Sequence, residues 1–165
     1  TSNVLAGEMF DVPVMGTHAH SWIMTFKDEY TAFKEYARLY PDACTLLVDT
    51  YDTLKSGVPN AIRVFTEMRE AGIKPKSYGI RLDSGDLAYL SKKARKMLDD
   101  AGFQDAVIAA SNDLDEFLIH DLKMQGAAIS SWGVGTNLIT SKDCPSFGGV
   151  YIRLNILCQL CNLIL

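Results

Sequence analysis

Short apolar runs alternate with amphipathic stretches through the middle of the chain. Short apolar runs bounded by turn residues predict buried strands, while apolar residues three or four positions apart predict amphipathic helices. The expected order is therefore β-α-β-α-β-α-β, which implies parallel strands joined by right-handed crossovers. The strands are expected at residues 45–50, 78–83, 106–111 and 128–135, and the helices at 60–71, 87–101 and 113–125.

This alternation is shared by the α/β barrel and the doubly wound sheet. A closed barrel needs eight strands, and the chain of 165 residues supplies about half of them. We therefore expect an α/β fold, a partial (β/α) barrel of about four parallel strands with crossover helices, over residues 1–151. Residues 152–165 are expected to form a divergent apolar tail, and both chain ends suggest a piece of a longer protein.

An aromatic series precedes the first expected strand, with members three or four residues apart. Such spacing allows a base-stacking platform, but it is more typical of a helix packed against a core. We expect packing for Trp22, Phe26, Tyr30, Phe33, Tyr36 and Tyr40.

Composition narrows the possible partners. The net charge of -4 lacks the basic footprint of a nucleic-acid binder. No Lys/Arg run exceeds two residues, which argues against a membrane-binding patch. Cys158 and Cys161 form a lone C-x-x-C without a nearby His, so reduced cytosolic thiols are the simpler interpretation of the cysteines. No basic and apolar leader opens the sequence, and a cytoplasmic location is expected.

Polar or Gly-rich turns follow all four expected strands. Because ligands of parallel α/β folds bind at the carboxyl ends of the strands, four such turns in succession predict one site. They lie at residues 49–50, 83–86, 111–113 and 133–136.

The turn after the second strand is the most informative. Asp83 follows Arg81 by two positions, so a carboxylate and a guanidinium share one face of the strand. Together they can orient an anionic or hydroxyl-rich ligand, and carboxylates here can hold ribose hydroxyls or Mg²⁺. Ser84, Gly85 and Asp86 are candidate substrate-binding residues, although a helix cap and a turn explain them equally well.

Two further segments carry candidate chemistry. Gly133, Gly135 and Thr136 follow the last strand, where glycines let backbone amides approach phosphate or simply make a turn. His18 and His20 fit a metal pair, a phosphate-accepting imidazole or a structural role. The third histidine lies on an expected helix and is read as a surface residue; it is His120.

Five ordered strings resemble the nicotinate phosphoribosyltransferase family, with similar gaps up to about Tyr151. This family forms nicotinate mononucleotide and pyrophosphate from nicotinate and phosphoribosyl pyrophosphate (PRPP), in NAD salvage, with coupled ATP hydrolysis. The resemblance implies a barrel of the type II phosphoribosyltransferase kind, Mg²⁺, a homodimeric parent enzyme and an N-terminal domain not represented here. The strings are GTHAHSW (16–22), LLVDTYDTLKSGVPNAI (46–62), IRLDSGDL (80–87), ASNDLDE (110–116) and GVGTNLITS (133–141).

The resemblance also implies residue roles. His20 matches the histidine that is phosphorylated, whereas His18 falls on a variable position of the motif. Arg81 matches an arginine near nicotinate, and Asp83 a carboxylate close to the reacting ribose. The phosphate-binding strand ends are matched by Ser111, Asn112, Gly133, Gly135 and Thr136.

Other functions stay open at this point. A nicotinamide phosphoribosyltransferase has a similar R-x-D-S-G pattern, although the motifs G-T-x-A-H-S and V-D-T-Y-D favour the acid-using family. A half barrel with open strand edges also suits a non-catalytic, truncated fragment that binds or assembles with other chains. An unrelated phosphate-binding barrel remains if the motif match is accidental, but no lysine for a Schiff base stands at a strand end.

Overall fold

The four expected strands form one parallel sheet in the computed structural model, which describes residues 1–140. Their order in the sheet is the order in the chain, and each strand pairs in parallel with the next. The α/β alternation and its parallel strands are thereby confirmed. The strands are β1 (Ala43–Leu47), β2 (Ser77–Leu82), β3 (Val107–Ala110) and β4 (Ser131–Trp132).

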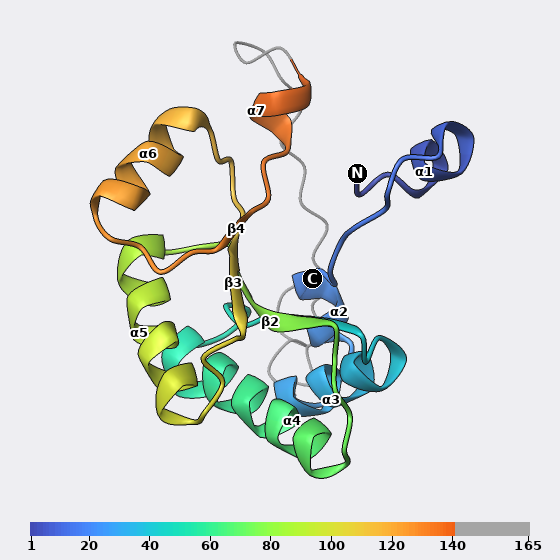
Figure 1. The fold of residues 1–165 in the computed structure, drawn as a ribbon, viewed down its shortest axis with the longest axis vertical. Coiled ribbons are helices and arrows are strands. Elements are labelled where there is room, and N and C mark those ends of the chain that lie inside the picture. Colours follow the sequence, from blue (N-terminus) through green and yellow to red (C-terminus); the bar gives the residue numbers. More distant parts are fainter. Residues whose placement is uncertain (141–165) are drawn as a thin grey trace, which may run out of the picture.

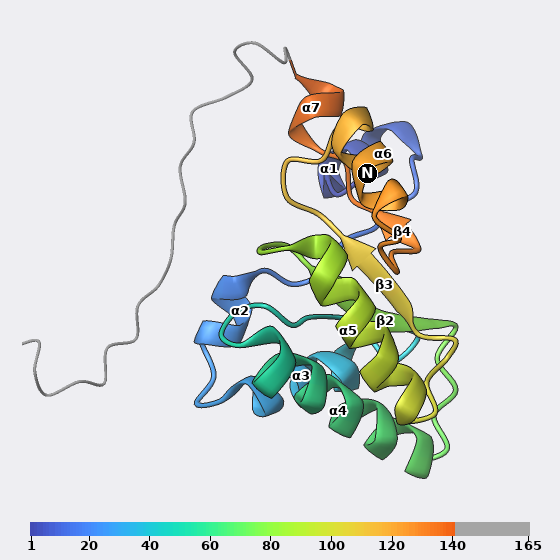
Figure 2. The same ribbon diagram turned by 90° about the vertical axis from the view of Figure 1, so that its left-hand side faces the viewer.

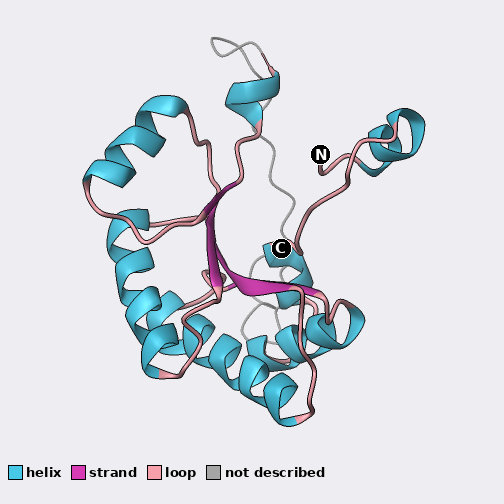
Figure 3. Cartoon of the chain, in the orientation of Figure 1, coloured by secondary structure: helices cyan, strands magenta, loops and turns pink. Residues whose placement is uncertain are grey.

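Four of the helices lie on one side of this sheet. Figure 3 shows the strands along the inside of an arc of helices, as in part of a (β/α) barrel. Seen from the side, α5 crosses in front of β2 and β3 (Figure 2), and it contacts both strands. The arc consists of α3 (Glu29–Leu39), α4 (Val58–Glu70), α5 (Leu87–Asp100) and α6 (Glu116–Met124).

The core lies between the sheet and this helix layer. Leu46, Ile80 and Ile108 are neighbours across β1, β2 and β3, and all are almost completely buried. Burial of one such side chain contributes about 1.5–3 kcal/mol, so this row helps to hold the three strands in register. Phe65 and Leu98 supply matching apolar surface from α4 and α5.

Several elements begin or end away from their expected positions. The last strand was expected over residues 128–135 but is only Ser131–Trp132, next to a β3 of four residues. α6 begins at Glu116 because Asp115 caps it, with its carboxylate accepting from the Leu118 amide at 2.8 Å. α4 begins two residues early because it continues from a π-helical turn, η1 (Thr53–Gly57).

The π-helical turn lies directly against the end of β1. At Gly57 a Cβ atom would stand 1.8 Å from the carbonyl oxygen of Val48. Only a residue without a side chain permits this approach, since real contacts of carbon with oxygen are far longer. Gly57 thereby allows η1 to pack closely against Val48, the residue that precedes Asp49 and Thr50.

The aromatic series packs as expected, but in two helices. Asp28 caps α3, so the run divides into α2 (His20–Met24) and α3. Phe33 and Tyr36 are buried in the core. Ahead of them, α1 (Val4–Phe10) stands apart from the sheet (Figure 1) and has no buried residue.

Two further points concern membranes and the end of the chain. No helix within residues 1–140 is both long and apolar enough to cross a membrane. The expected tail at 152–165, together with Cys144, Cys158 and Cys161, lies outside the described residues.

Candidate active site

Asp49 joins the ends of β1 and β2. It stands two residues beyond β1, and its side chain is only 2% exposed. Its Oδ2 atom accepts hydrogen bonds from the backbone N–H of Asp83 and from the hydroxyl of Ser84, both at 2.7 Å. Asp49 therefore holds the turn that follows β2, while its Oδ1 atom is buried without a hydrogen-bond partner among the described residues.

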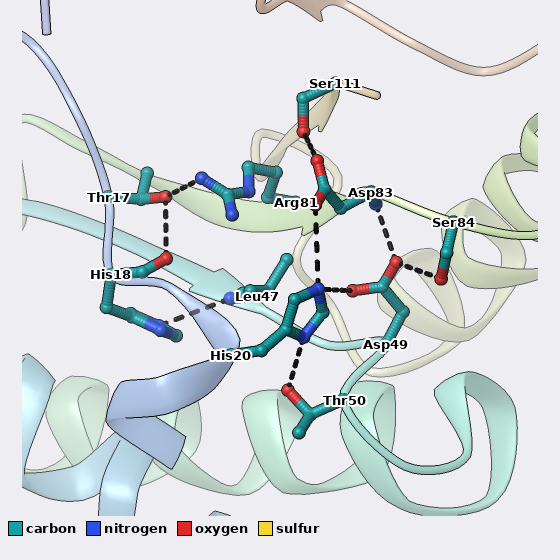
Figure 4. Close-up of polar contacts among 10 residues, drawn as sticks. All are labelled: Thr17, His18, His20, Leu47, Asp49, Thr50, Arg81, Asp83, Ser84 and Ser111. Atoms are coloured by element: carbon teal, nitrogen blue, oxygen red, sulfur yellow. Dashed lines mark hydrogen bonds and ion pairs between the residues drawn. The ribbon is translucent and has the colours of Figure 1, made fainter. Parts of the chain in front are cut away.

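His20 reaches into the same cluster from the first turn of α2 (Figure 4). Its Nε2 atom is 3.9 Å from Asp49 Oδ1 and 3.6 Å from Asp83 Oδ2. Its Nδ1 atom is 3.0 Å from the hydroxyl of Thr50. The imidazole is thus held on two sides, yet about a third of it remains exposed to solvent.

A third strand end meets this cluster through Ser111, just beyond β3. Its hydroxyl donates a hydrogen bond to Asp83 Oδ1, and its backbone N–H donates to Leu82 at 3.0 Å. Gly133 follows β4 and lies close beside it, since a Cβ atom there would be 3.4 Å from Ser111 Cβ. The carboxyl ends of all four strands therefore converge, as parallel α/β folds require of a ligand site.

Arg81 points from β2 toward the segment that precedes α2. Its Nη1 donates a hydrogen bond to the hydroxyl of Thr17, and no carboxylate of the described residues lies within salt-bridge distance. Its Nε is buried and has no partner there either. A partly buried guanidinium whose Nε lacks a hydrogen-bond partner is suited to an anionic ligand.

His18 has a different environment from His20. It is buried, its Nε2 accepts a hydrogen bond from the Leu47 backbone at 3.3 Å, and its ring lies edge-on to Tyr36. Burial lowers the pKa of His18 from 6.5 to about 4. The neutral imidazole therefore anchors the segment to β1. A metal pair with His20 is not supported, because residues 1–140 contain no metal-type group of three His, Cys, Asp or Glu. As expected, His120 is exposed on α6.

Comparison with known proteins decides the family. The model of the nicotinate phosphoribosyltransferase (NAPRTase) family matches residues 1–162.

The chain belongs to the nicotinate phosphoribosyltransferase family.

Relatives in this family support the assignment. Nicotinate phosphoribosyltransferase of Bacillus subtilis is 63% identical over 151 residues, which cover 92% of this chain and 30% of that protein. The enzyme of Dictyostelium discoideum is 40% identical over 92% of this chain and 33% of its own. The crystal structure of human nicotinic acid phosphoribosyltransferase superposes with a TM-score of 0.72 at 28% identity, covering 81% of this chain and 37% of that one. The chain thus spans about a third of the length of these relatives.

Several residues in the family motifs lie at the same strand ends but outside the hydrogen-bonded cluster. Gly85 and Asn112 adopt positive φ angles of 75° and 88° in their turns. Asp86 caps α5, its carboxylate accepting from the Tyr89 amide at 2.9 Å. Two further motif residues lie at the start of the short α7 (Thr136–Ile139). Gly135 is its N-cap and Thr136 is its first residue. Their assignment to substrate binding stays a prediction.

Three residues of this candidate site had no individual role predicted from the sequence. Asp49 and Thr50 lie in the first of the four strand-end turns that predicted a site, but their contacts with Asp83 and His20 were not foreseen. Thr17 belongs to the first motif, but its contact with Arg81 joins residues 64 positions apart. No local pattern reveals a contact at that separation.

Proposed function

We propose that this chain carries part of the active site of a nicotinate phosphoribosyltransferase. In this proposal the whole protein forms nicotinate mononucleotide and pyrophosphate from nicotinate and PRPP, with coupled ATP hydrolysis, in NAD salvage. The observation that carries it is the meeting of His20 with the carboxylates of Asp49 and Asp83 at the strand ends. The names of the relatives favour nicotinate over nicotinamide.

Arg81 is the proposed partner of the nicotinate carboxylate. Its guanidinium has hydrogen-bonding capacity left, because Nε is buried without a partner among the described residues. A planar guanidinium matches a carboxylate in geometry as well as charge. Nicotinamide has no such charge, so the same arrangement selects the acid.

Asp83 is the proposed group beside the reacting ribose. Loss of pyrophosphate leaves a cation-like anomeric carbon, which a preorganised carboxylate stabilises. The hydrogen bonds from Ser111 to the side chain and from the Asp83 backbone to Asp49 hold this carboxylate before substrate arrives. Backbone amides near Asn112, Gly133 and Gly135 are the proposed contacts of the phosphates.

His20 is the proposed phosphoryl acceptor. A ring nitrogen attacks the γ-phosphorus of ATP, the bond to the bridging oxygen breaks, and ADP leaves. The phosphoryl group then adds negative charge beside Asp49 and Asp83, which can alter how the site holds PRPP. Hydrolysis of the phosphohistidine returns the starting state.

Mg²⁺ fits this site only together with a phosphate ligand. The residues 1–140 offer no three-ligand group, but Mg²⁺ commonly uses one or two carboxylates and completes its shell with water and substrate phosphates. Asp49, whose Oδ1 accepts no hydrogen bond from the described residues, and Asp83 are the carboxylates that would hold it. The ion would neutralise charge on the pyrophosphate leaving group.

We further propose that the whole protein works in the cytoplasm as a homodimer, on small molecules and without nucleic acid or a membrane. The chain has a net charge of -4, which offers no general attraction for polyanions.

The proposal is tested on the full-length protein with PRPP, Mg²⁺ and ATP. Nicotinate should be converted to its mononucleotide, and nicotinamide should not compete at equal concentration. Labelled ATP should mark the wild type and His18→Ala, but not His20→Ala. Efficient use of nicotinamide, or labelling that survives His20→Ala and not His18→Ala, would show that the assignment is wrong.

A further inference from the structure

A pocket of about 290 Å³ lies where β2 and β3 begin, at the opposite end of these strands from the candidate active site. Its lining includes Tyr78, the second residue of β2, whereas Asp83 follows the last residue of that strand. These two residues are five positions apart, and a strand rises about 3.3 Å per residue, so they are separated by roughly 16 Å. The pocket is therefore distinct from the candidate active site.

Three aromatic rings form the floor of this pocket. Phe65 and Phe103 are buried, and Tyr78 is half-buried beside them. The ring of Phe65 is edge-on to both others, with centroids 5.0 Å from Tyr78 and 5.9 Å from Phe103. Met68 and Ile73 add apolar surface from the end of α4 and from the loop that follows it. Such a floor suits a flat, apolar ring system.

Two cationic side chains also line the pocket. The guanidinium carbon of Arg69 lies 4.5 Å from the centre of the Phe103 ring, and Lys74 belongs to the loop between α4 and β2. Within residues 1–140, no carboxylate lies within salt-bridge distance of Arg69 or Lys74. Unpaired cations are common on protein surfaces, but these two stand beside an apolar floor. An anion attached to a ring can therefore use both features together.

The acidic residue of the lining is already engaged. The Asp105 carboxylate accepts a hydrogen bond from the hydroxyl of Tyr78. Burial and this hydrogen bond raise the pKa of Tyr78, so the phenol keeps its proton and remains the donor. The lining thus carries two positive charges, from Arg69 and Lys74, and one negative charge, from Asp105. The resulting net charge of +1 matches a monoanion better than a dianion such as phosphate.

We propose that this pocket is a binding site for a small aromatic monocarboxylate. The ring system lies on Phe65, Tyr78 and Phe103, and the carboxylate pairs with Arg69 and Lys74. Removal of the rings from water supplies most of the affinity, while the charge pair selects an acid over its neutral amide. Ligand pockets usually measure about 300–1,000 Å³, so this one, at the lower limit, admits a fused pair of rings and little more.

The test is an NMR titration of the full-length protein, labelled at its methionine and isoleucine methyl groups. The probes are naphthalene-2-carboxylate and, separately, naphthalene-2-carboxamide. The acid should shift the methyl resonances of Met68 and Ile73, with a dissociation constant on the order of 1 mM or tighter for so small a ligand. The amide should bind at least tenfold more weakly, because it lacks the charge.

Variants separate the charge from the apolar floor. In the double variant Arg69→Met with Lys74→Met, the acid should bind no better than the amide, since methionine keeps an apolar stem but no charge. Lys123→Met is the matched control, because it removes an exposed cation on α6, and its affinity for the acid should equal that of the wild type. Arg81→Gln alters the candidate active site and should also leave the Met68 and Ile73 shifts unchanged.

Three results would overturn the proposal. They are equal affinity for acid and amide, loss of the shifts in Arg81→Gln but not in the double variant, and absence of binding because another part of the full-length protein fills the pocket. If the double variant does not fold, the wild type still decides. Shifts at Met68 and Ile73 with a tenfold preference for the acid support the site, and their absence contradicts it.

Discussion

Asp49 holds the main chain of Asp83 rather than its side chain, through a 2.7 Å hydrogen bond from the Asp83 N–H to Asp49 Oδ2. The end of β1 thereby sets the direction in which β2 delivers its carboxylate. Because the same oxygen also accepts from Ser84, one buried group organises the whole turn.

Replacement of Asp49 by Ala should therefore harm both folding and turnover. The variant leaves the Asp83 N–H without its acceptor, and a buried donor left unsatisfied costs about 1–3 kcal/mol. Ser84→Ala removes only one of the two hydrogen bonds and should cost about 1 kcal/mol. Urea unfolding of full-length variants measures both changes. Equal stability of Asp49→Ala and wild type would rule out this organising role.

Asp83→Asn should lower turnover while the fold persists. An amide oxygen can still accept the hydrogen bond from Ser111, so the melting temperature should change little. Loss of negative charge beside a cation-like ribose should reduce kcat on the order of 10²-fold. Steady-state rates and thermal melts are compared with those of Ser111→Ala. A large fall in melting temperature at an unchanged rate would instead make Asp83 structural.

Thr17 should affect nicotinate binding through Arg81. In Thr17→Val the guanidinium loses its hydroxyl acceptor and its fixed orientation. We expect the KM for nicotinate to rise about fivefold to tenfold, with kcat less affected, as for one lost hydrogen bond. Thr17→Ser keeps the hydroxyl and should restore the KM. A KM that does not respond to Thr17→Val would dissociate this residue from Arg81 and nicotinate.

His18 should make the protein sensitive to acid. Its pKa is about 4 in the fold and about 6.5 when exposed, so the unfolded chain binds the proton more readily. The stabilisation is thus fully present above pH 6.5 and is lost as the pH falls toward 4, by about 3 kcal/mol. Urea titrations at pH 7 and 4.5 should show a smaller loss for His18→Gln than for wild type. His120→Gln, at an exposed position, should retain the wild-type loss.

Gly57→Ala should strongly destabilise the fold. The backbone at Gly57 is right-handed helical, with φ of -58°, so alanine would suit the conformation itself. Its methyl group would nevertheless stand 1.8 Å from the Val48 carbonyl, and such overpacking costs about 1–3 kcal/mol or more. Gly16→Ala is the control, because nothing lies within 4 Å of its added methyl. Similar melting temperatures for the two variants would contradict the packing described.

Periodicity was sufficient to predict the sheet, because each apolar run must be buried and each amphipathic helix must cover it. The same periodicity overestimated the length of β4, because that length depends on pairing with the four residues of β3 and not on the apolar character of β4 itself. The site was predicted in part. Strand ends located Asp49, Asp83 and Ser111, and the family motif matched His20 and not His18. The hydrogen bonds by which Asp49 holds the turn of Asp83 and Ser84 depend on β1 and β2 lying side by side, which no local pattern specifies.

The anchoring of His18 to Leu47 has a practical consequence for splitting this protein into complementing halves. His18 and His20 are separated by one residue, so a break inserted after position 18 would detach the His20 imidazole from the strand that locates it. A break before Gly16 would leave that connection whole, because the contacts of Thr17, His18 and His20 all run forward to the sheet. A split point therefore belongs in the exposed stretch at residues 11–15, where two segments can be rejoined without disturbing these contacts.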